Sequence, residues 1–319
     1  MTLKLTNWWM LISLVLALSV SACAPTVTPT VQWIGVSDTP QPTAIPPTMT
    51  PTQVSVVMPS PTPTPQNAQP TPDEAPPLTP TPHHCWANGG YLEEDSISTT
   101  VLEFPLEFRV YLPPCYYHQT ERYFPVLYLF HGLYSTDIQW VRMGVTETAA
   151  RLMGAREIPQ FIIIMPRDRD WSLPPDNKFG EMIISELVPW IDSQYRTIPG
   201  HEFRAIGGLS RGGNWAIHLG LRYWGMFGAI GAHSAPVFYT DGLQLSRWLN
   251  EIPPERMPRI FLDIGENDGD GDYFHKFEEM LSERGIPHEW HLNSGTHNEE
   301  YWSAHLEQYL RWYSEAWGE

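Results

Sequence analysis

Residues 205–213 read AIGGLSRGG and stand between a short apolar run and a helix-length amphipathic one. Gly208, Ser210 and Gly212 match the pattern Gly-x-Ser-x-Gly, which is typical of a strand that turns sharply into a helix. Small residues are needed here, because a Cβ two positions before or after the serine would collide with the turn. The serine hydroxyl then projects above the sheet, beside the positively polarised helix start. We therefore predict that Ser210 is a nucleophile.

The chain on both sides of this turn alternates between short β-rich apolar runs and amphipathic runs long enough for helices. The first two predicted strands follow one another directly, as in a hairpin, and the others alternate with helices. This order predicts an α/β fold with a mainly parallel central sheet, an antiparallel start and helices on both faces. The strands are expected over residues 96–103, 106–112, 125–131, 160–165, 203–207, 228–232, 259–264 and 289–292, and the helices over 145–152, 178–195, 211–223, 241–250, 272–284 and 299–316.

A serine hydroxyl reacts only when a base removes its proton, and the base must itself be oriented by a third group. In chains with this turn, the order along the sequence is serine, then acid, then histidine. The chain has 12 histidines, but only His297 lies in a loop between the last predicted strand and a following helix. We predict that His297 is the general base.

The acid is expected where the preceding strand ends, in the segment RIFLDIGEND over residues 259–268. Asp263 lies inside the predicted strand and would sit too deep in the sheet. Asp268 lies in the loop just beyond the strand and is the predicted acid, with Asp270 as the second choice.

The same acidic loop has a competing interpretation as a calcium site. Asp268, Asp270, Asp272 and Glu279 have the spacing of ligand positions 1, 3, 5 and 12 of an EF-hand loop. Position 6 of that loop needs glycine for its sharp turn, and here it is Tyr273. We therefore expect no metal site in this loop.

A second loop is expected beside the nucleophile, after the apolar strand that ends at His131, Gly132 and Leu133. In enzymes with this turn, one backbone N–H after the nucleophile and one from this early loop bind the oxyanion. Here these are the N–H groups of Arg211 and Leu133. Gly132 allows the backbone to approach the substrate, and His131 is expected to shape the loop through local hydrogen bonds.

Taken in order, these motifs resemble the esterase D-type α/β-hydrolases, a group that includes feruloyl and acetyl-xylan esterases and is similar to the mycolyltransferases. The resemblance runs over about residues 96–315, nearly the whole of the expected domain. It rests on residues 110–113 (VYLP), 123–128 (YFPVLY), 131–133 (HGL), 186–189 (ELVP), the turn at Ser210, 265–268 (GEND), and 295–297 (GTH) followed by Tyr301 and Trp302.

The resemblance implies an α/β-hydrolase fold and ester hydrolysis through a covalent acyl-enzyme, with no cofactor. It leaves the substrate open. Acyl or feruloyl esters of polysaccharides are the leading interpretation, and acyl transfer to an acceptor other than water, as in mycolyltransferases, is the alternative. One cytosolic branch hydrolyses S-formylglutathione, which the export signal described below argues against. A non-catalytic binding module displayed on a stalk is the alternative from another class.

Three aromatic residues are expected near the mouth of the site: Tyr134, Trp140 and Trp171. Rings of this kind combine a large apolar face with a polar edge, which suits contact with sugar or phenolic rings. They fit equally well as packing in the core or at the rim, and the sequence leaves both interpretations open.

The N-terminus has the features of a bacterial lipoprotein signal. One lysine precedes an apolar run over residues 8–20, which is too short to cross a bilayer comfortably. Residues 20–23 (VSAC) resemble a lipobox, whose cysteine is diacylated and becomes the mature N-terminus. We expect residues 1–22 to be a signal peptide and Cys23 to anchor the exported protein to the cell membrane. An ordinary signal peptide with a chance cysteine is the alternative.

Composition separates a stalk from a folded domain. Of the 61 residues from 24 to 84, 30 are Pro or Thr, so this stretch lacks the apolar surface that would offset its ordering entropy. Residues 23–84 are therefore expected to form an extended, disordered stalk, and residues 85–319 one catalytic domain.

The formal net charge of −17 disfavours nucleic acid and anionic lipid as partners.

Two cysteines remain once Cys23 is assigned to the lipid. Cys85 and Cys115 would lie in an oxidising compartment, and we predict a disulfide between them. The alternative is a metal site that uses His83, His84 and Cys85. No second cluster at ligand spacing accompanies these residues, which argues against a metal.

Overall fold

The computed structural model describes residues 84–87 and 89–318. The expected signal peptide, Cys23 and residues 24–83 of the expected stalk lie outside the described residues. Within the described ranges, none of the helices has the length and apolar content needed to cross a bilayer.

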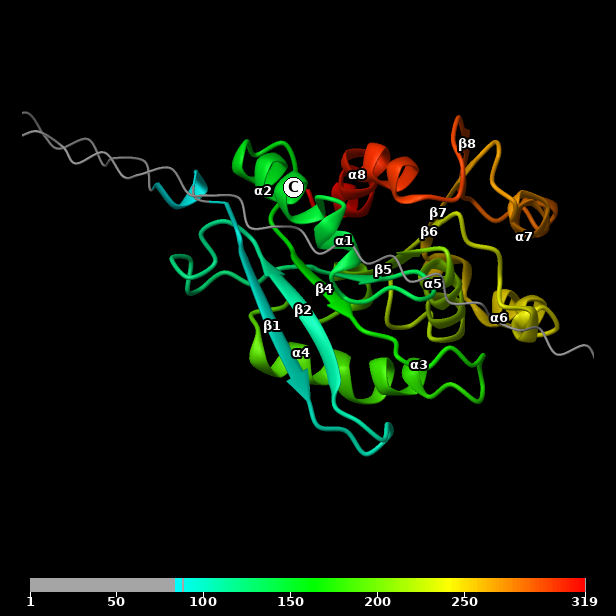
Figure 1. Cartoon of the computed structure of the whole chain (residues 1–319), viewed down its shortest axis with the longest axis horizontal. Coiled ribbons are helices and arrows are strands. Elements are labelled where there is room, and N and C mark those ends of the chain that lie inside the picture. Colours follow the sequence, from blue (N-terminus) through cyan, green and yellow to red (C-terminus); the bar gives the residue numbers. More distant parts are fainter. Residues whose placement is uncertain (1–83, 88, 319) are drawn as a thin grey trace, which may run out of the picture. The chain divides into compact units, whose positions relative to one another are not determined.

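Eight strands form one sheet in the order β1-β2-β4-β3-β5-β6-β7-β8 (Figure 1). β2 is antiparallel to both β1 and β4, whereas the strands from β3 to β8 are parallel. The predicted mainly parallel sheet with an antiparallel start is confirmed. The strands are β1 Tyr91–Ile97, β2 Leu106–Leu112, β3 Val126–Phe130, β4 Ile162–Pro166, β5 Arg204–Leu209, β6 Ala229–His233, β7 Arg259–Gly265 and β8 Glu289–Asn293.

The first strand lies earlier in the chain than the sequence predicted. β1 covers Tyr91–Ile97 rather than residues 96–103, and residues 98–105 form the connection to β2. The prediction was wrong because β1 is an edge strand, on which Glu94 and Asp95 are exposed. Charged side chains keep an edge strand from pairing with other chains, and they also interrupt the apolar pattern by which strands are recognised.

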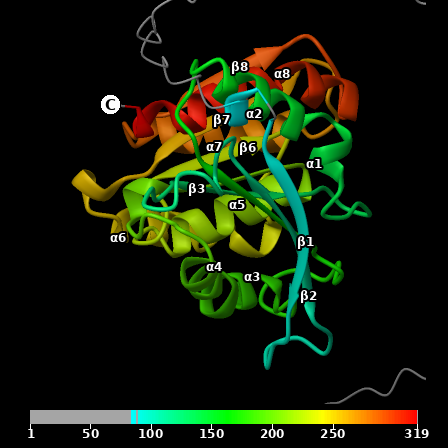
Figure 2. The same ribbon diagram turned by 90° about the vertical axis from the view of Figure 1, so that its left-hand side faces the viewer.

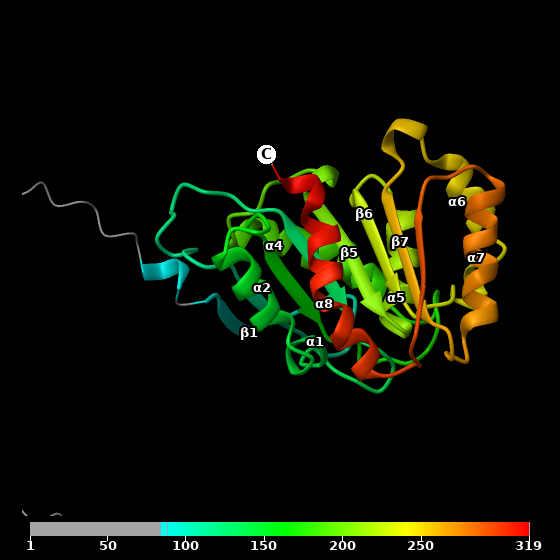
Figure 3. The same cartoon turned by 90° about the horizontal axis from the view of Figure 1, so that it is seen from above.

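Helices cover both faces of the sheet, as predicted (Figures 2 and 3). α1, α2 and α8 pack on one face, and α3 to α7 pack on the other. The helix predicted over residues 178–195 is one helical segment in three parts, with the π-helical η2 in the middle. The α-helices and η2 are α1 Gln139–Arg142, α2 Val145–Gly154, α3 Phe179–Met182, η2 Ile183–Leu187, α4 Val188–Gln194, α5 Arg211–Arg222, α6 Leu245–Glu251, α7 Gly271–Glu283 and α8 Glu299–Ser314; the short 3-10 turns are η1 His84–Trp86, η3 His201–Phe203, η4 Tyr239–Asp241, η5 Pro254–Arg256 and η6 Glu315–Trp317.

The sheet has an apolar core on each side, because alternate residues of a strand point to opposite faces. In β3, Val126, Tyr128 and Phe130 pack towards α3 to α7, whereas Leu127 and Leu129 pack towards α1, α2 and α8. All five are buried. A strand with helices on both faces therefore reads as a continuous apolar run, which is why the central strands could be recognised.

The parallel strands end on one side of the sheet, and the loops after β3, β5, β7 and β8 carry the predicted site residues there. Ligands generally bind at this carboxyl end in open α/β sheets. Cys85 and Cys115 form a disulfide at the opposite, amino end. Cys115 follows β2, and β2 runs antiparallel to β4, so the end of β2 lies beside the start of β4.

Candidate active site

Ser210 lies in the turn between β5 and α5 with φ 51° and ψ −127°, a strained conformation for a residue with a side chain. The two flanking glycines are required by the space around them. A Cβ on Gly208 would lie 2.8 Å from the backbone nitrogen of Gly213, and a Cβ on Gly212 would lie 2.7 Å from the carbonyl oxygen of His131. The sharp turn predicted from the Gly-x-Ser-x-Gly pattern is present.

Ser210, His297 and Asp268 meet at the carboxyl end of the sheet. The Oγ of Ser210 lies 2.9 Å from Nε2 of His297, and Nδ1 of His297 lies 2.9 Å from Oδ2 and 3.1 Å from Oδ1 of Asp268. The Asp268 side chain is fully buried, and its carboxylate accepts a hydrogen bond from the Nδ1–H of His297. Nε2 of the same imidazole then carries no proton and can accept the proton of Ser210. The structure thus brings together all three residues predicted as nucleophile, base and acid.

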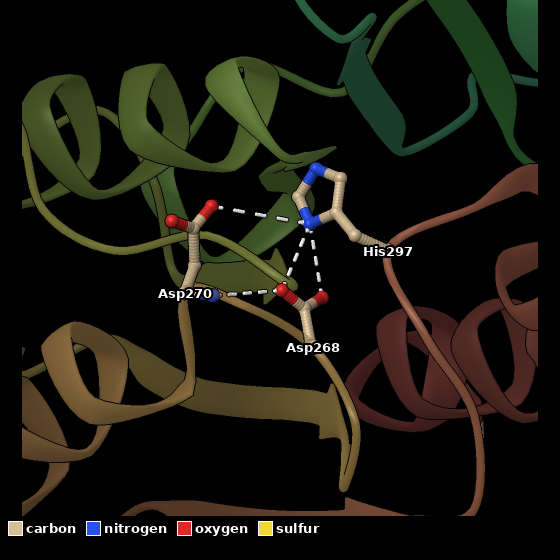
Figure 4. Close-up of side chains that lie close together, drawn as sticks. All are labelled: Asp268, Asp270 and His297. Atoms are coloured by element: carbon tan, nitrogen blue, oxygen red, sulfur yellow. Dashed lines mark hydrogen bonds and ion pairs between the residues drawn. The ribbon is translucent and has the colours of Figure 1, made fainter.

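Asp270 is a second carboxylate near the imidazole (Figure 4). Its Oδ2 lies 3.9 Å from Nδ1 of His297, and its backbone N–H donates to Oδ1 of Asp268 at 3.0 Å. Its side chain is 46% exposed, whereas that of Asp268 is fully buried. Of the two predicted candidates for the acid, Asp268 is thus the closer to His297 and the more buried.

The donor atoms of Asp268, Asp270 and His297 lie close enough to hold a metal ion. Binding there would require Nδ1 of His297 to give up its proton and its hydrogen bond to Asp268, and the imidazole would lose its orientation. The EF-hand interpretation fails on the backbone, because α7 begins at Gly271, within the twelve-residue window that would have to be a loop.

The loop after β3 lies directly beside the nucleophile. A Cβ on Gly132 would be 3.6 Å from the Cβ of Ser210. The N–H of Gly132 is already used, because it donates to Oε1 of Gln139 at 2.8 Å. Among the hydrogen bonds of the described residues, the N–H groups of Leu133 and Arg211 donate to no other group. Both predicted oxyanion donors are thus available next to Ser210.

Gln139 connects this loop to the helix that follows the base, and the sequence did not predict its role. Its Oε1 accepts from Gly132, and its Nε2 donates to Oε1 of Glu299 at 2.9 Å. Glu299 is the first residue of α8, and the hydrogen bond from Arg142 lowers its pKa. Gln139 and Glu299 are 160 positions apart, so sequence spacing carries no signal of this contact.

His131 has the local structural role that the sequence predicted. Its Nδ1–H donates to the carbonyl of Gly132 at 2.8 Å, and its Nε2 accepts from the backbone N–H of Asp168 at 2.9 Å. These two bonds fix a neutral imidazole, and burial lowers the pKa of His131 in agreement with that state.

Asp168 and Arg211 form a buried ion pair that the sequence analysis missed. Oδ2 of Asp168 accepts from Nε of Arg211 at 3.2 Å and from Nε1 of Trp215 at 3.0 Å. The guanidinium of Arg211 also donates to the carbonyl oxygens of Asp170 at 3.1 Å and of Ser172 at 2.6 Å. The loop between β4 and α3 is therefore fastened to the helix that begins at the nucleophile.

Two of the three aromatic residues expected near the mouth are exposed. Tyr134 is 73% exposed and Trp171 is 56% exposed, and their rings pack edge to face with centroids 4.7 Å apart. For Trp140 the core interpretation that the sequence left open is correct: it is 1% exposed and donates its Nε1–H to the carbonyl of Phe130 at 3.0 Å. Trp140 belongs to the core because α1 turns its indole inward against the sheet.

The model of the family described as "Putative esterase" matches residues 99–313, which span most of the described residues. The chain belongs to this esterase family. The described domain has the α/β-hydrolase fold, as the resemblance implied.

Two sequence relatives carry related names. An esterase of Mycobacterium tuberculosis is 28% identical, over 58% of this chain and 51% of the relative. An endo-1,4-beta-xylanase/feruloyl esterase of Xylanibacter ruminicola is 29% identical, over 60% of this chain and 26% of the relative. This chain spans about half the length, or less, of these curated relatives.

Solved structures agree with this assignment. A ferulic acid esterase is similar with a TM-score of 0.65 and 27% identity, over 72% of this chain and 99% of that one. A ferulic acid esterase from Anaeromyces mucronatus, solved in complex with ferulic acid, gives a TM-score of 0.58 at 18% identity, over 72% and 92% of the two chains. The second likeness supports the fold alone.

Proposed function

We propose that the domain hydrolyses carboxylic esters with Ser210 as nucleophile, His297 as general base and Asp268 as the acid that orients the base. The observation that carries this proposal is the continuous line of hydrogen bonds from Ser210 Oγ through both ring nitrogens of His297 to Asp268. A buried carboxylate at Nδ1 selects the tautomer that a base at Nε2 requires.

The reaction follows from these positions. As Oγ of Ser210 attacks the ester carbonyl carbon, its proton passes to Nε2 of His297, and the carbonyl oxygen becomes an oxyanion held by the N–H groups of Leu133 and Arg211. The oxyanion collapses, the bond to the alcohol oxygen breaks, and the alcohol leaves with the proton from Nε2. Water then attacks the acyl carbon as it gives a proton to Nε2 of His297. The bond from the acyl carbon to Oγ breaks, Oγ takes the proton from Nε2, and the carboxylic acid leaves.

For the substrate, we propose acyl or feruloyl esters of polysaccharides. The exposed edge-to-face pair of Tyr134 and Trp171 supports this, because it offers an aromatic surface beside the oxyanion loop. The Xylanibacter relative, which is named as both a xylanase and a feruloyl esterase, supports the same substrate class.

The experiment is hydrolysis of p-nitrophenyl acetate and methyl ferulate by the wild type and by Ser210→Ala. We expect turnover of both esters, and a loss of about 10³-fold to 10⁶-fold in kcat on removal of the hydroxyl. Equal rates for the two proteins would refute Ser210 as nucleophile. Product analysis with an added sugar acceptor separates hydrolysis from acyl transfer, and absence of turnover on both esters would favour a binding module.

We further propose that the protein is exported and anchored to the cell membrane through Cys23, with the Pro/Thr-rich segment as a stalk. The lipobox-like residues 20–23 and the composition of residues 24–84 support this. The test is membrane fractionation of the wild type and of Cys23→Ala. We expect the variant to move to the soluble fraction, and an unchanged distribution would contradict the lipid anchor.

A further inference from the structure

A second acid–histidine pair lies beneath the candidate active site, and the proposed mechanism does not use it. Asp263 of β7 and His233 of β6 stand opposite one another in the sheet, and both side chains are fully buried. Nδ1 of His233 lies 2.6 Å from Oδ1 of Asp263. A carboxylate without contact to water is costly unless several donors surround it, so its other partners indicate what it does.

Two tyrosines of α8 donate to the other oxygen of this carboxylate. The hydroxyls of Tyr301 and Tyr309 each lie 2.7 Å from Oδ2 of Asp263. Burial and the neighbouring carboxylate raise the pKa of both tyrosines far above the ordinary value, so both remain donors. The two tyrosines are thus alike in their hydrogen bonds to Asp263, and they differ in that the Tyr301 hydroxyl also accepts from Nδ2 of Asn293.

Only one of the two tyrosines touches the loop that carries the base. The ring of Tyr301 packs under Gly295, where a Cβ would lie 3.2 Å from Cε2 of the ring and closer still to Cδ2. Gly295 has φ 151° and stands two positions before His297. The backbone N–H of Tyr301 also donates at 2.9 Å to Oδ1 of Asn298, the residue that caps α8 directly after His297. Tyr309 lies further along α8, where its ring stacks on His233.

His233, the partner of Asp263 in β6, also contacts Ser210. The carbonyl oxygen of His233 accepts the backbone N–H of Ser210 at 2.8 Å. Next to it, Oγ of Ser234 accepts Nε1–H of Trp302 at 3.1 Å, and the Trp302 ring packs edge-on against the imidazole of His297 with centroids 5.1 Å apart. The buried pair is thus connected to the backbone of Ser210 directly, and to the imidazole of His297 through Ser234 and Trp302.

We propose that Tyr301 is a positioning residue for His297, and that Asp263 is the buried acceptor that fixes it. The Tyr301–Asp263 bond holds the first turn of α8, and with it residues 295–298, against β7, which β6 joins to the strand that ends at Ser210. This inference rests on the proposed ester hydrolysis, in which the distance from Nε2 of His297 to Oγ of Ser210 governs the rate.

The matched pair of tyrosines provides the experiment. Tyr301→Phe and Tyr309→Phe each remove one hydroxyl from the same carboxylate oxygen and keep the ring, so both are expected to fold and to lower the melting temperature. Tyr301→Phe also removes the hydroxyl that accepts from Nδ2 of Asn293 at 3.1 Å. We expect Tyr301→Phe to lower kcat on p-nitrophenyl acetate by about tenfold, with KM changed less than about twofold, because a small displacement of the base slows the chemical step. For Tyr309→Phe, we expect kcat within about twofold of the wild type.

A merely structural role would make the two variants alike. Equal loss of kcat in both, or an unchanged kcat in Tyr301→Phe, would overturn the proposal. The rate at which a fluorophosphonate labels Ser210 gives a second readout, because it needs the same base but no carboxylic ester substrate. If the wild type hydrolyses no tested ester, the proposed function fails, and the labelling rates of the two variants still decide the role of Tyr301 by the same criterion.

Discussion

At the scale of single residues, Asp268 and Asp270 both face His297, but only the side chain of Asp268 is buried. Asp268 is enclosed and hydrogen-bonded to Nδ1, whereas Asp270 is half exposed and 3.9 Å away. A carboxylate in water contributes little to orienting an imidazole, because its interaction is screened. The sequence could rank the two only by their distance from the strand end, and the structure supplies the physical reason for that ranking.

The first prediction compares these two residues. We expect Asp268→Asn to lower kcat by about 10³-fold to 10⁴-fold, because the amide no longer selects the tautomer that leaves Nε2 free. Asp270→Asn is the matched control, and we expect it to stay within about threefold of the wild type. Ester hydrolysis at pH 8 measures both, and a larger loss in the Asp270 variant would assign the acid to Asp270 instead.

The second prediction concerns acid sensitivity at His131. Burial holds the pKa of this imidazole below its ordinary value of 6.5. Between the two pKa values His131 is protonated in the unfolded chain and neutral in the folded protein. The free energy of unfolding should therefore fall as the pH drops through about 6.5 towards the lower folded-state pKa. We expect His131→Gln to show a flatter pH dependence between about pH 7 and pH 5 in urea titrations. Parallel curves for the two proteins would contradict this.

The site residues that the sequence could predict differ from those that it could not in how they depend on the strands. Ser210, Asp268 and His297 could be predicted because each follows a strand, and the carboxyl ends of parallel strands converge. Gln139, Asp168 and Tyr301 could not be assigned their roles, because their partners are distant in sequence and a single side chain carries no periodic signal. The position of Trp140 stayed open for a related reason: composition does not reveal which way a four-residue helix turns its indole.

At the scale of secondary structure, contacts between α1 and α8 join the loop after β3 to the loop after β8, which carries His297. Gln139 of α1 bridges Gly132 and Glu299, so the loop after β3 is fixed by the helix that follows His297. Strand and helix patterns predicted α8 correctly, but α1 has only four residues and is too short to show a helical period.

The third prediction tests this bridge. We expect Gln139→Ala to lower kcat by about tenfold to 100-fold, because the Gly132 N–H loses its acceptor and the Leu133 N–H is no longer held in place. Arg142→Ala is the control: Arg142 also binds Glu299, but this pair is exposed and contributes at most about 1 kcal/mol. Kinetics on one ester with both variants suffice, and similar losses in the two would indicate that Glu299 alone matters.

At the scale of the whole domain, the disulfide between Cys85 and Cys115 closes a loop with a sequence separation of 30. The fourth prediction is that Cys85→Ser with Cys115→Ser lowers the free energy of unfolding by about 3–4 kcal/mol, through the larger entropy of the unfolded chain. The activity per folded molecule should stay unchanged, because the bridge lies at the amino end of the sheet. Urea unfolding measures the loss, and an effect on kcat below the transition would contradict this account.

That location has a consequence for how the enzyme meets its substrate. The described chain enters the domain at Cys85 on one end of the sheet, while Ser210 opens on the other. Whatever holds residue 84, whether a membrane, a resin or a fused protein, would leave the reactive hydroxyl unobstructed. A substrate then reaches Ser210 from the end of the sheet opposite to that attachment.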